Sequence, residues 1–155
     1  MQLRSIDKSI YRQRYRKVFV AVIVALVAIS LSVSTALIHW VGNPQGSNFS
    51  LNLTGVLVAV AVVTFVIYRF RHHPWMDEVV YVWQLKQELN RIYRKQRHIE
   101  PLLEDNDPDA IIIMYYQLHG SRQLYELDDN TITMDDLGIK IRALDSRIES
   151  LGLCI

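Results

Sequence analysis

The chain has 155 residues, of which 50% are hydrophobic and 21% are charged, and its 17 Lys and Arg side chains nearly balance 16 Asp and Glu side chains. Positions 18–68 nevertheless form a run of 51 residues without Asp, Glu, Lys or Arg, so the charge is confined to the rest of the chain. This separation excludes an ordinary soluble globule and a disordered chain, and a single Cys excludes an internal disulfide framework.

Two membrane-spanning helices are predicted in the uncharged stretch. Residues 18–41 form an apolar segment of 24 residues, which as a helix extends about 36 Å and so crosses a hydrocarbon core of about 30 Å. The second segment, 51–68, has 18 residues and is just long enough. Between them, residues 42–50 contain Pro44 and two Gly residues, which disfavour a helix and predict a short turn. The chain is therefore expected to be an all-α membrane protein that begins with a two-helix transmembrane hairpin.

Basic residues flank both spans, whereas the turn between them carries no charge. Residues 1–17 hold six Lys or Arg side chains against one acid, Asp7, and two more Arg side chains follow the second span. Basic flanks stay on the cytoplasmic side, so both termini are expected in the cytoplasm and the turn in the periplasm. The side chains expected to contact anionic lipid are Arg12, Arg14, Arg16, Lys17, Arg69 and Arg71.

An alternative interpretation makes the first apolar segment a cleaved signal peptide, with Ser34 and Ala36 as the small residues before the cut. The basic region before it is 17 residues long, and the apolar stretch continues past Ala36. Both features favour a retained transmembrane helix.

Small residues recur every three or four positions in both spans, a spacing that lets two helix backbones approach closely. The favoured interpretation is that they pack the two helices of the hairpin together, and the alternative is a face for another subunit. The predicted packing residues are Ala21, Ala25, Ala28, Ser32, Gly55 and Ala59.

The remaining residues, 69–155, are predicted to form a small cytoplasmic helical bundle. Helix starts are indicated by Pro74 and by Asp107 placed before Pro108, and Pro101 is expected to end the first helix within a residue or two. The predicted helices cover about 74–100, 107–127 and 134–151.

Two of these helices carry apolar residues at alternating spacings of three and four, which is a heptad pattern. Such seams can pack within one chain, but a seam can also remain available to a second copy or another protein, and dimerisation would help so small a domain. The predicted protein-interaction residues are Leu85, Leu89, Ile92, Leu137, Ile141, Leu144 and Ile148.

The sequence contains no recognisable catalytic, cofactor or metal motif. The D-x-D-x-D run at 105–109 begins a calcium-loop pattern, but Ala110 occupies the position that needs Gly. A basic stripe from Arg91 to His98 belongs to an acidic domain, so we interpret it as a solvated face and expect no nucleic-acid partner.

These observations predict a membrane protein with a cytoplasmic interaction or assembly module and no enzymatic activity. The expected partners are the lipid bilayer, a second copy of the chain, or another membrane or cytoplasmic protein. The alternative function is an accessory subunit of a membrane channel or transporter complex.

Four segments of the sequence connect the chain to a known group of proteins. They are the YRQRYRK start, the Gly-Asn-Pro-Gln-Gly-Ser turn, His73 to Lys95 with its YVWQLKQELNRIYRK run, and YYQLHGSRQLYELDDNTIT from Tyr115 to Thr133. In these segments the chain resembles an uncharacterised family of small gammaproteobacterial two-span inner-membrane proteins. The resemblance covers nearly the whole length and implies a bacterial inner membrane and no assigned activity, so no catalytic residue is carried over.

Overall fold

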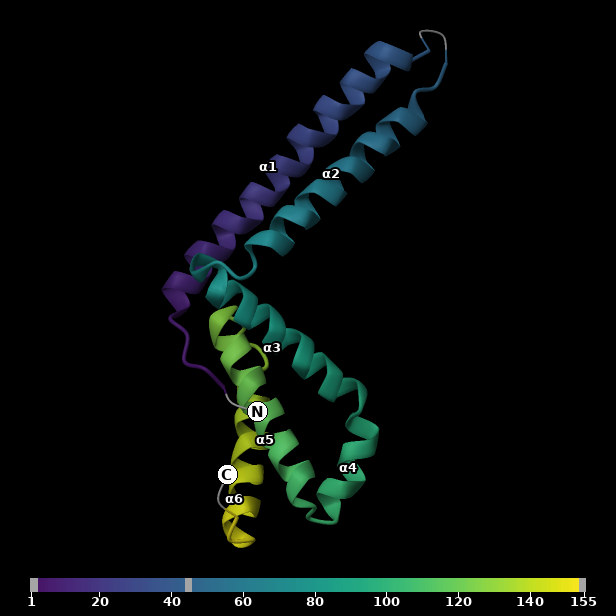
Figure 1. Ribbon diagram of the computed structural model, residues 1–155. Helices are drawn as coiled ribbons and strands as arrows, with labels where there is room; N and C mark the ends of the chain where they lie inside the picture. Colours follow the sequence, from purple (N-terminus) through teal and green to yellow (C-terminus); the bar gives the residue numbers. More distant parts are fainter. Residues whose placement is uncertain (1–2, 44–45, 154–155) are drawn as a thin grey trace. The chain divides into compact units, whose positions relative to one another are not determined.

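The computed structural model describes residues 3–43 and 46–153, and the regular structure in these ranges is entirely helical. The prediction of an all-α chain is therefore confirmed. Figure 1 shows the order of the helices: α1 (Lys8–Val41), α2 (Phe49–Phe70), the 3-10 turn η1 (Pro74–Met76), α3 (Asp77–Arg94), α4 (Gln96–Glu104), α5 (Pro108–Leu127) and α6 (Met134–Ser150).

The chain divides into two compact units. The helical unit contains the residues up to Tyr11 together with those from Glu78 onward, and the hairpin unit contains Arg12–Asp77. Both ends of the hairpin unit therefore continue into the same helical unit. Residues 1–17, the basic flank of the first predicted span, are divided between the two units, and α1 already begins at Lys8.

In the hairpin unit, α1 and α2 are each long and apolar enough to cross a membrane. They approach closely at Gly55, where a Cβ atom would lie 2.1 Å from Ser34 Oγ and 2.9 Å from the Ser30 carbonyl oxygen. Only glycine fits this contact, because a side chain would have to displace the backbone of α1. The predicted turn lies between α1 and α2, but Pro44 is outside the described residues.

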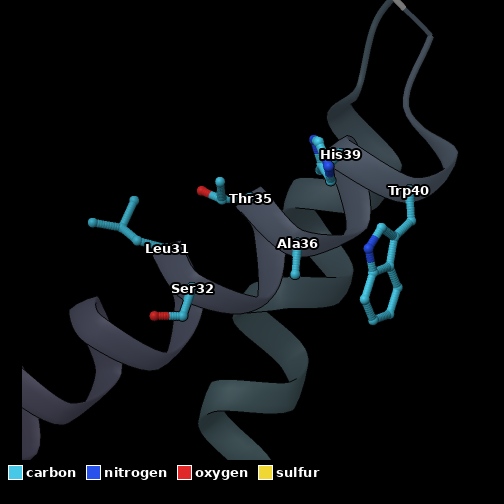
Figure 2. A pocket seen from close by; sticks show the side chains of 6 residues that line it. All are labelled: Leu31, Ser32, Thr35, Ala36, His39 and Trp40. Atoms are coloured by element: carbon cyan, nitrogen blue, oxygen red, sulfur yellow. The ribbon is translucent and has the colours of Figure 1, made fainter.

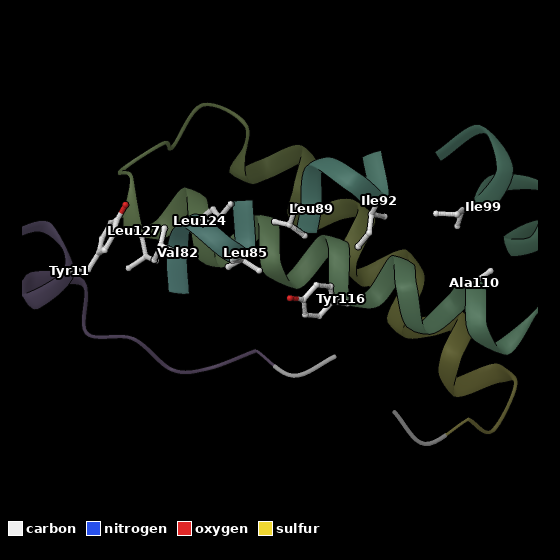
Figure 3. Packing of buried hydrophobic residues seen from close by; sticks show 10 residues of the cluster. All are labelled: Tyr11, Val82, Leu85, Leu89, Ile92, Ile99, Ala110, Tyr116, Leu124 and Leu127. Carbon is white, nitrogen blue, oxygen red and sulfur yellow. The ribbon is translucent and has the colours of Figure 1, made fainter. Parts of the chain in front are cut away.

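In the helical unit, α5 packs against α3 through Gly120. A Cβ atom on Gly120 would lie 3.1 Å from Leu89 Cδ2 and 3.3 Å from Leu85 Cδ1, so the bare backbone lets the α3 side chains rest on α5. Figure 3 shows Leu85 and Leu89 in the resulting core, together with Tyr116 and Leu124 of α5.

A second group of buried residues joins α5 to α6. Ile111 of α5 is fully buried and packs with Leu144 and Ile148 of α6. Because α3 contacts one side of α5 and α6 contacts another, α5 is the central helix of the unit.

The helix predicted over 74–100 is wrong as a single element. The chain begins with η1, continues as α3, turns at Lys95 and restarts as α4, which contains Pro101 in its interior and does not end there. The turn at Lys95 directs Ile99 into the same core cluster as Ala110, near the start of α5. Burial of Ile99 against α5 thus replaces the straight heptad continuation that the spacing predicts.

Candidate interaction surfaces

The seven predicted protein-interaction residues all lie in the interior of the helical unit. Leu85, Leu89 and Ile92 belong to the core between α3 and α5, and the four residues of the second seam lie on the α6 face that packs against α5. Each of the seven is at most 9% exposed. Both seams are therefore packed within the chain itself, although Leu89, Leu137 and Leu144 also line the groove described below.

The N-terminal residues 3–7, here called the strap, are tied to α3 and α5 by hydrogen bonds. The backbone N–H of Arg4 donates to the Tyr81 hydroxyl at 2.8 Å, and the Gln123 side-chain amide donates to the Arg4 carbonyl at 2.6 Å. The Tyr81 hydroxyl in turn donates to Gln123 Oε1 at 3.1 Å. The backbone of one strap residue, Arg4, is thus held on both sides by two side chains that come from two different helices.

Apolar contacts and an ion pair extend this attachment. Leu3 and Ile6 pack against the core cluster, and Tyr11, in the first turn of α1, is only 3% exposed. Lys8 forms an ion pair with Asp129 in the α5–α6 loop. The strap and the first turn of α1 are therefore part of the folded helical unit.

Asp7 ends the strap and caps α1. Its Oδ1 accepts hydrogen bonds from the Ser9 hydroxyl at 2.6 Å and from the backbone N–H groups of Ser9 and Ile10 at 2.8 and 3.1 Å. These hydrogen bonds hold the pKa of Asp7 below its usual value, and the bond from the Ser9 hydroxyl has the largest effect. The cap fixes the point at which the extended strap becomes helix.

A groove of about 960 Å³ runs along the helical unit between α3–α4 on one side and α6 on the other. We call it the α3–α6 groove. Its floor is formed by α5 and its walls by α3, α4 and α6. Side chains that line it include Tyr93, Leu103, Met114, Gln117, Lys140 and Ala143.

Both ends of the α3–α6 groove are bridged by cationic side chains. At one end Lys86 of α3 pairs with Asp128, beyond the last residue of α5, at 2.8 Å. At the other, Arg147 of α6 donates to Asn106 Oδ1 at 2.8 Å and to the Glu104 carbonyl at 3.0 Å. The Lys86 pair connects α3 to the end of α5, and the Arg147 contacts connect α6 to the end of α4.

The small residues of α1 do not all face α2, and this part of the packing prediction is wrong. Gly55 and Ala59 of α2 are buried against α1 as predicted, and Ala25 is partly buried. The other three, Ala21, Ala28 and Ser32, are exposed, because the side of α1 that packs on α2 includes the buried Ser34 instead. Together with the exposed Ala36 of the same helix they are here called the small-residue face.

The small-residue face continues toward the end of α1 as a shallow hollow. Figure 2 shows its lining, in which every side chain comes from α1: Leu31, Ser32, Thr35, Ala36, His39 and Trp40. The Ser32 hydroxyl donates to the Ala28 carbonyl of its own helix at 2.7 Å, so it is satisfied without a partner helix.

The basic side chains predicted to contact lipid have different surroundings. Arg14 is partly buried, and its Nη1 donates to the carbonyl of Trp75 at 3.1 Å. The Arg71 guanidinium lies 4.2 Å from the ring centre of Tyr68. The remaining four, whose side chains are exposed, are Arg12, Arg16, Lys17 and Arg69.

A polar pair links α3 to α5. The hydroxyl of Tyr116, a residue that is 7% exposed, donates to Oε2 of the exposed residue Glu88 at 2.5 Å. Burial, and then the hydrogen bond to Glu88 and its charge, raise the pKa of Tyr116 above its usual range. The pair joins the two helices and shows no nucleophile or cofactor arrangement.

Replacing Tyr116 by Phe is expected to cost about 1 kcal/mol at neutral pH, because the hydrogen bond to Glu88 is lost. Since the folded chain holds the Tyr116 proton more tightly than the unfolded chain, the stabilisation is complete below pH about 10 and is lost as the pH rises above it. The Tyr116→Phe chain has no hydroxyl to ionise, so it should not lose this stabilisation at alkaline pH. Protease resistance of the full chain at pH 8 and pH 10.5 measures it, with exposed Tyr93→Phe as control, and an equal pH dependence in all three chains would contradict the assignment.

A His–Asp contact links α5 to α6. Nε2 of His119 lies 3.9 Å from Asp145 Oδ1, and the His119 ring lies against the Tyr115 ring, with 4.1 Å between ring centres and the two planes tilted by 34°. Among the described residues, no group of three or more His, Cys, Asp or Glu side chains is placed to hold a metal ion.

Comparison with known proteins identifies the family of the chain. No curated protein and no solved structure matches it. A family described as "Protein of unknown function (DUF3087)" matches residues 1–155. Since that match covers the whole chain, the protein belongs to the DUF3087 family.

Proposed function

We propose that the chain is a two-span protein of the bacterial inner membrane whose helical unit lies in the cytoplasm and acts as an interaction or assembly module without catalytic activity. The observation that carries the proposal is that residues before α1 and residues after α2 belong to one folded unit.

The surface of the hairpin unit supports insertion into a bilayer. Large apolar side chains cover both helices on the sides that do not pack together, and Leu31, Leu57 and Phe65 are 63%, 60% and 68% exposed. Each such side chain would gain about 1.5 to 3 kcal/mol on full removal from water. Lipid is the environment that covers a continuous apolar surface of this length.

The strap supports a hairpin whose two ends emerge on the same side. Arg4 of the strap is bonded to Tyr81 and Gln123, which follow α2, so the unit cannot fold if the membrane separates them. The basic flanks then favour the cytoplasmic side. Cleavage after Ala36, the signal-peptide alternative, would remove the strap and Tyr11 from the core.

Reporter fusions test this topology. A reporter that is active only in the periplasm is expected to be active when fused after Gly46 and inactive when fused after Leu153. Activity at Leu153 would contradict the proposal.

A second candidate function, an accessory subunit of a channel or transporter, is favoured by the exposed small-residue face of α1. Small residues on a lipid-facing surface allow close approach of another transmembrane helix. A side of α1 that faced only lipid would be expected to carry large apolar side chains in place of these small ones. This function places the partner in the membrane and not on the helical unit.

Replacing Ala28 by Leu tests this candidate. If another transmembrane helix packs there, Ala28→Leu is expected to reduce the amount of large complex in gently solubilised membranes by about tenfold, a loss of about 1.4 kcal/mol. The matched control is Ala61→Leu on the exposed surface of α2, which should leave the complex intact. Equal complex with both variants would exclude a partner at the small-residue face.

A further inference from the structure

We infer that a cluster of basic side chains at the turn between α3 and α4 binds a short acidic segment of a partner protein. The cluster, here called the basic corner, consists of Arg91, Arg94, Lys95, Arg97 and His98. The corner would be the surface through which the helical unit carries out the proposed interaction, so the inference rests on the proposed function and deepens it.

The turn between α3 and α4, visible as a bend in Figure 1, brings these side chains together. The backbone N–H groups of Lys95 and His98 each donate to the carbonyl three positions earlier, both at 2.9 Å. Hydrogen bonds of this spacing align side chains that are three positions apart. Arg97 therefore follows Arg94 on the same side, as His98 follows Lys95, and Arg91 is the neighbour of Arg94 one turn earlier on α3.

The charge of the basic corner is not neutralised within the part of the chain that the structure describes. All five residues are exposed, and none of their side chains forms an ion pair or a hydrogen bond with another described residue. The nearest acids in the sequence bond to other groups, since Glu88 accepts from the Tyr116 hydroxyl and Glu100 accepts from Gln96 Nε2 at 2.8 Å. The positive charge of the corner is thus open to a partner.

The start of α4 adds to this positive charge. Arg97 and His98 lie in its first turn, which contains no acid, and the N-cap residue Lys95 makes no side-chain cap hydrogen bond. Acidic side chains are the ones that stabilise a helix start, because the N-terminal end of the helix dipole is positive. An acidic segment of a partner would supply the negative charge that the chain itself does not place there.

The charge of the corner is opposite to that of the rest of the domain. Residues 89–99 contain four Lys or Arg side chains and no acid, whereas the remainder of residues 74–155 carries five basic and fifteen acidic side chains. An acidic segment is therefore attracted to the corner and repelled by the surface around it. Three of the four cations are Arg, whose guanidinium can donate two parallel hydrogen bonds to one carboxylate.

The corner is short, which favours a short acidic segment over an extended anion. Positions 91 to 97 extend about 9 Å along a helix, the length of about three residues of an extended chain. A nucleic-acid strand or an anionic bilayer would continue beyond the corner and meet Glu88, Glu100 and the acidic remainder of the domain. A short run of Asp or Glu in a partner protein ends where the corner ends.

Peptide binding to the full-length chain tests the inference. The chain is held in nanodiscs of uncharged lipid, and the probe is a short fluorescent peptide in which Glu alternates with Ser. A second peptide has Gln in place of every Glu. The acidic peptide is expected to bind saturably and at least about tenfold more tightly than the Gln peptide, with affinity falling as salt is added. Empty nanodiscs correct for adsorption to lipid.

Two double variants locate the binding. Arg91→Gln with Arg94→Gln removes two charges of the corner and is expected to weaken binding of the acidic peptide at least about tenfold. The matched control, Lys140→Gln with Arg142→Gln, removes two exposed α6 charges that likewise have no ion pair among the described residues, and should change the affinity less than about twofold. Protease resistance equal to that of the original chain verifies that both variants are folded.

Equal binding of the two peptides would overturn the inference, as would a loss of affinity that is no larger in the corner variant than in the α6 control. Single-stranded oligo-dT or phosphatidylglycerol vesicles that bind to the corner in place of the acidic peptide would assign it to an extended anion and also overturn the inference. These results are independent of the reporter fusions, so binding at the corner can fail while the membrane topology holds.

Discussion

Leu85→Asp is expected to unfold the helical unit. Leu85 is 2% exposed and contacts α5 at Gly120, where no space is left for water or for a counter-ion. Losing a buried Leu side chain costs about 2 to 5 kcal/mol, and burying an unpaired carboxylate adds to that cost. The sum is comparable with the whole stability of a small domain, about 5 to 15 kcal/mol.

Limited proteolysis of the full chain in detergent measures the effect, because cleavage follows the population of open molecules. Leu85→Asp should be cut rapidly within the helical unit, while Gln87→Asp, at an exposed position two residues along the same helix, should behave as the original chain does. Equal protease resistance of the two variants would mean that the α3 seam is not buried in α5.

Because the two heptad seams are buried, substitutions in them are unsuitable for testing whether the helical unit binds a partner. Charged substitutions in the seams, such as Leu89→Asp or Leu144→Asp, would disrupt folding and so cannot separate a binding defect from an unfolded domain. Surface positions such as Ala143 and Lys140 avoid the problem, because both side chains are exposed.

Deleting residues 2–7 is expected to destabilise the helical unit by about 3 kcal/mol. The deletion removes two partly buried apolar side chains, Leu3 and Ile6, at about 1 kcal/mol each. It also removes the hydrogen bonds that the Arg4 backbone makes with Tyr81 and Gln123. A change of this size corresponds to a cleavage rate about 100-fold higher in the same proteolysis experiment.

A double-mutant cycle separates loss of the strap from a general loss of stability. In the full chain, Gln123→Ala should cost about 1 kcal/mol, because it removes the hydrogen bond to the Arg4 carbonyl. In the chain without residues 2–7 the same substitution should cost clearly less, because the bond to the Arg4 carbonyl is already absent and only the hydrogen bond from the Tyr81 hydroxyl is left to lose. Additive effects of the two changes would contradict the attachment of the strap.

Local patterns in the sequence predicted much of the fold. Asp107 before Pro108 indicated the start of α5, and the structure confirms it, since Asp107 Oδ1 accepts from the Ala110 N–H at 2.9 Å. The uncharged run predicted two long apolar helices, which the structure also contains, because composition and length alone specify such helices.

Contacts between distant residues could not be predicted in this way. The strap joins Arg4 to Gln123 across most of the chain, and its only signal in the sequence is the apolar Leu3 and Ile6 within a basic, polar segment. Pro101 was expected to end a helix, but burial of Ile99 against α5 moved the break to Lys95. Tertiary packing decided each of these outcomes.

The α3–α6 groove also depends on tertiary structure. Its lining includes Leu89, Leu137 and Leu144 of the two heptad seams, but Tyr93 and Lys140 have no local pattern that brings them to one surface. The small residues of α1 illustrate the same limit, since their spacing predicts close packing but does not say which side of the helix meets α2.

Cysteine labelling in intact cells tests the central claim most directly. In a chain with Cys154→Ser, single cysteines replace Ser5 in the strap, Ser47 in the turn and Ser146 in α6, all three of which are exposed. A membrane-impermeant maleimide is expected to label only the Ser47→Cys chain, and the other two should react after the cells are permeabilised. Labelling of Ser5→Cys or Ser146→Cys in intact cells would contradict a hairpin whose two ends meet in one cytoplasmic unit.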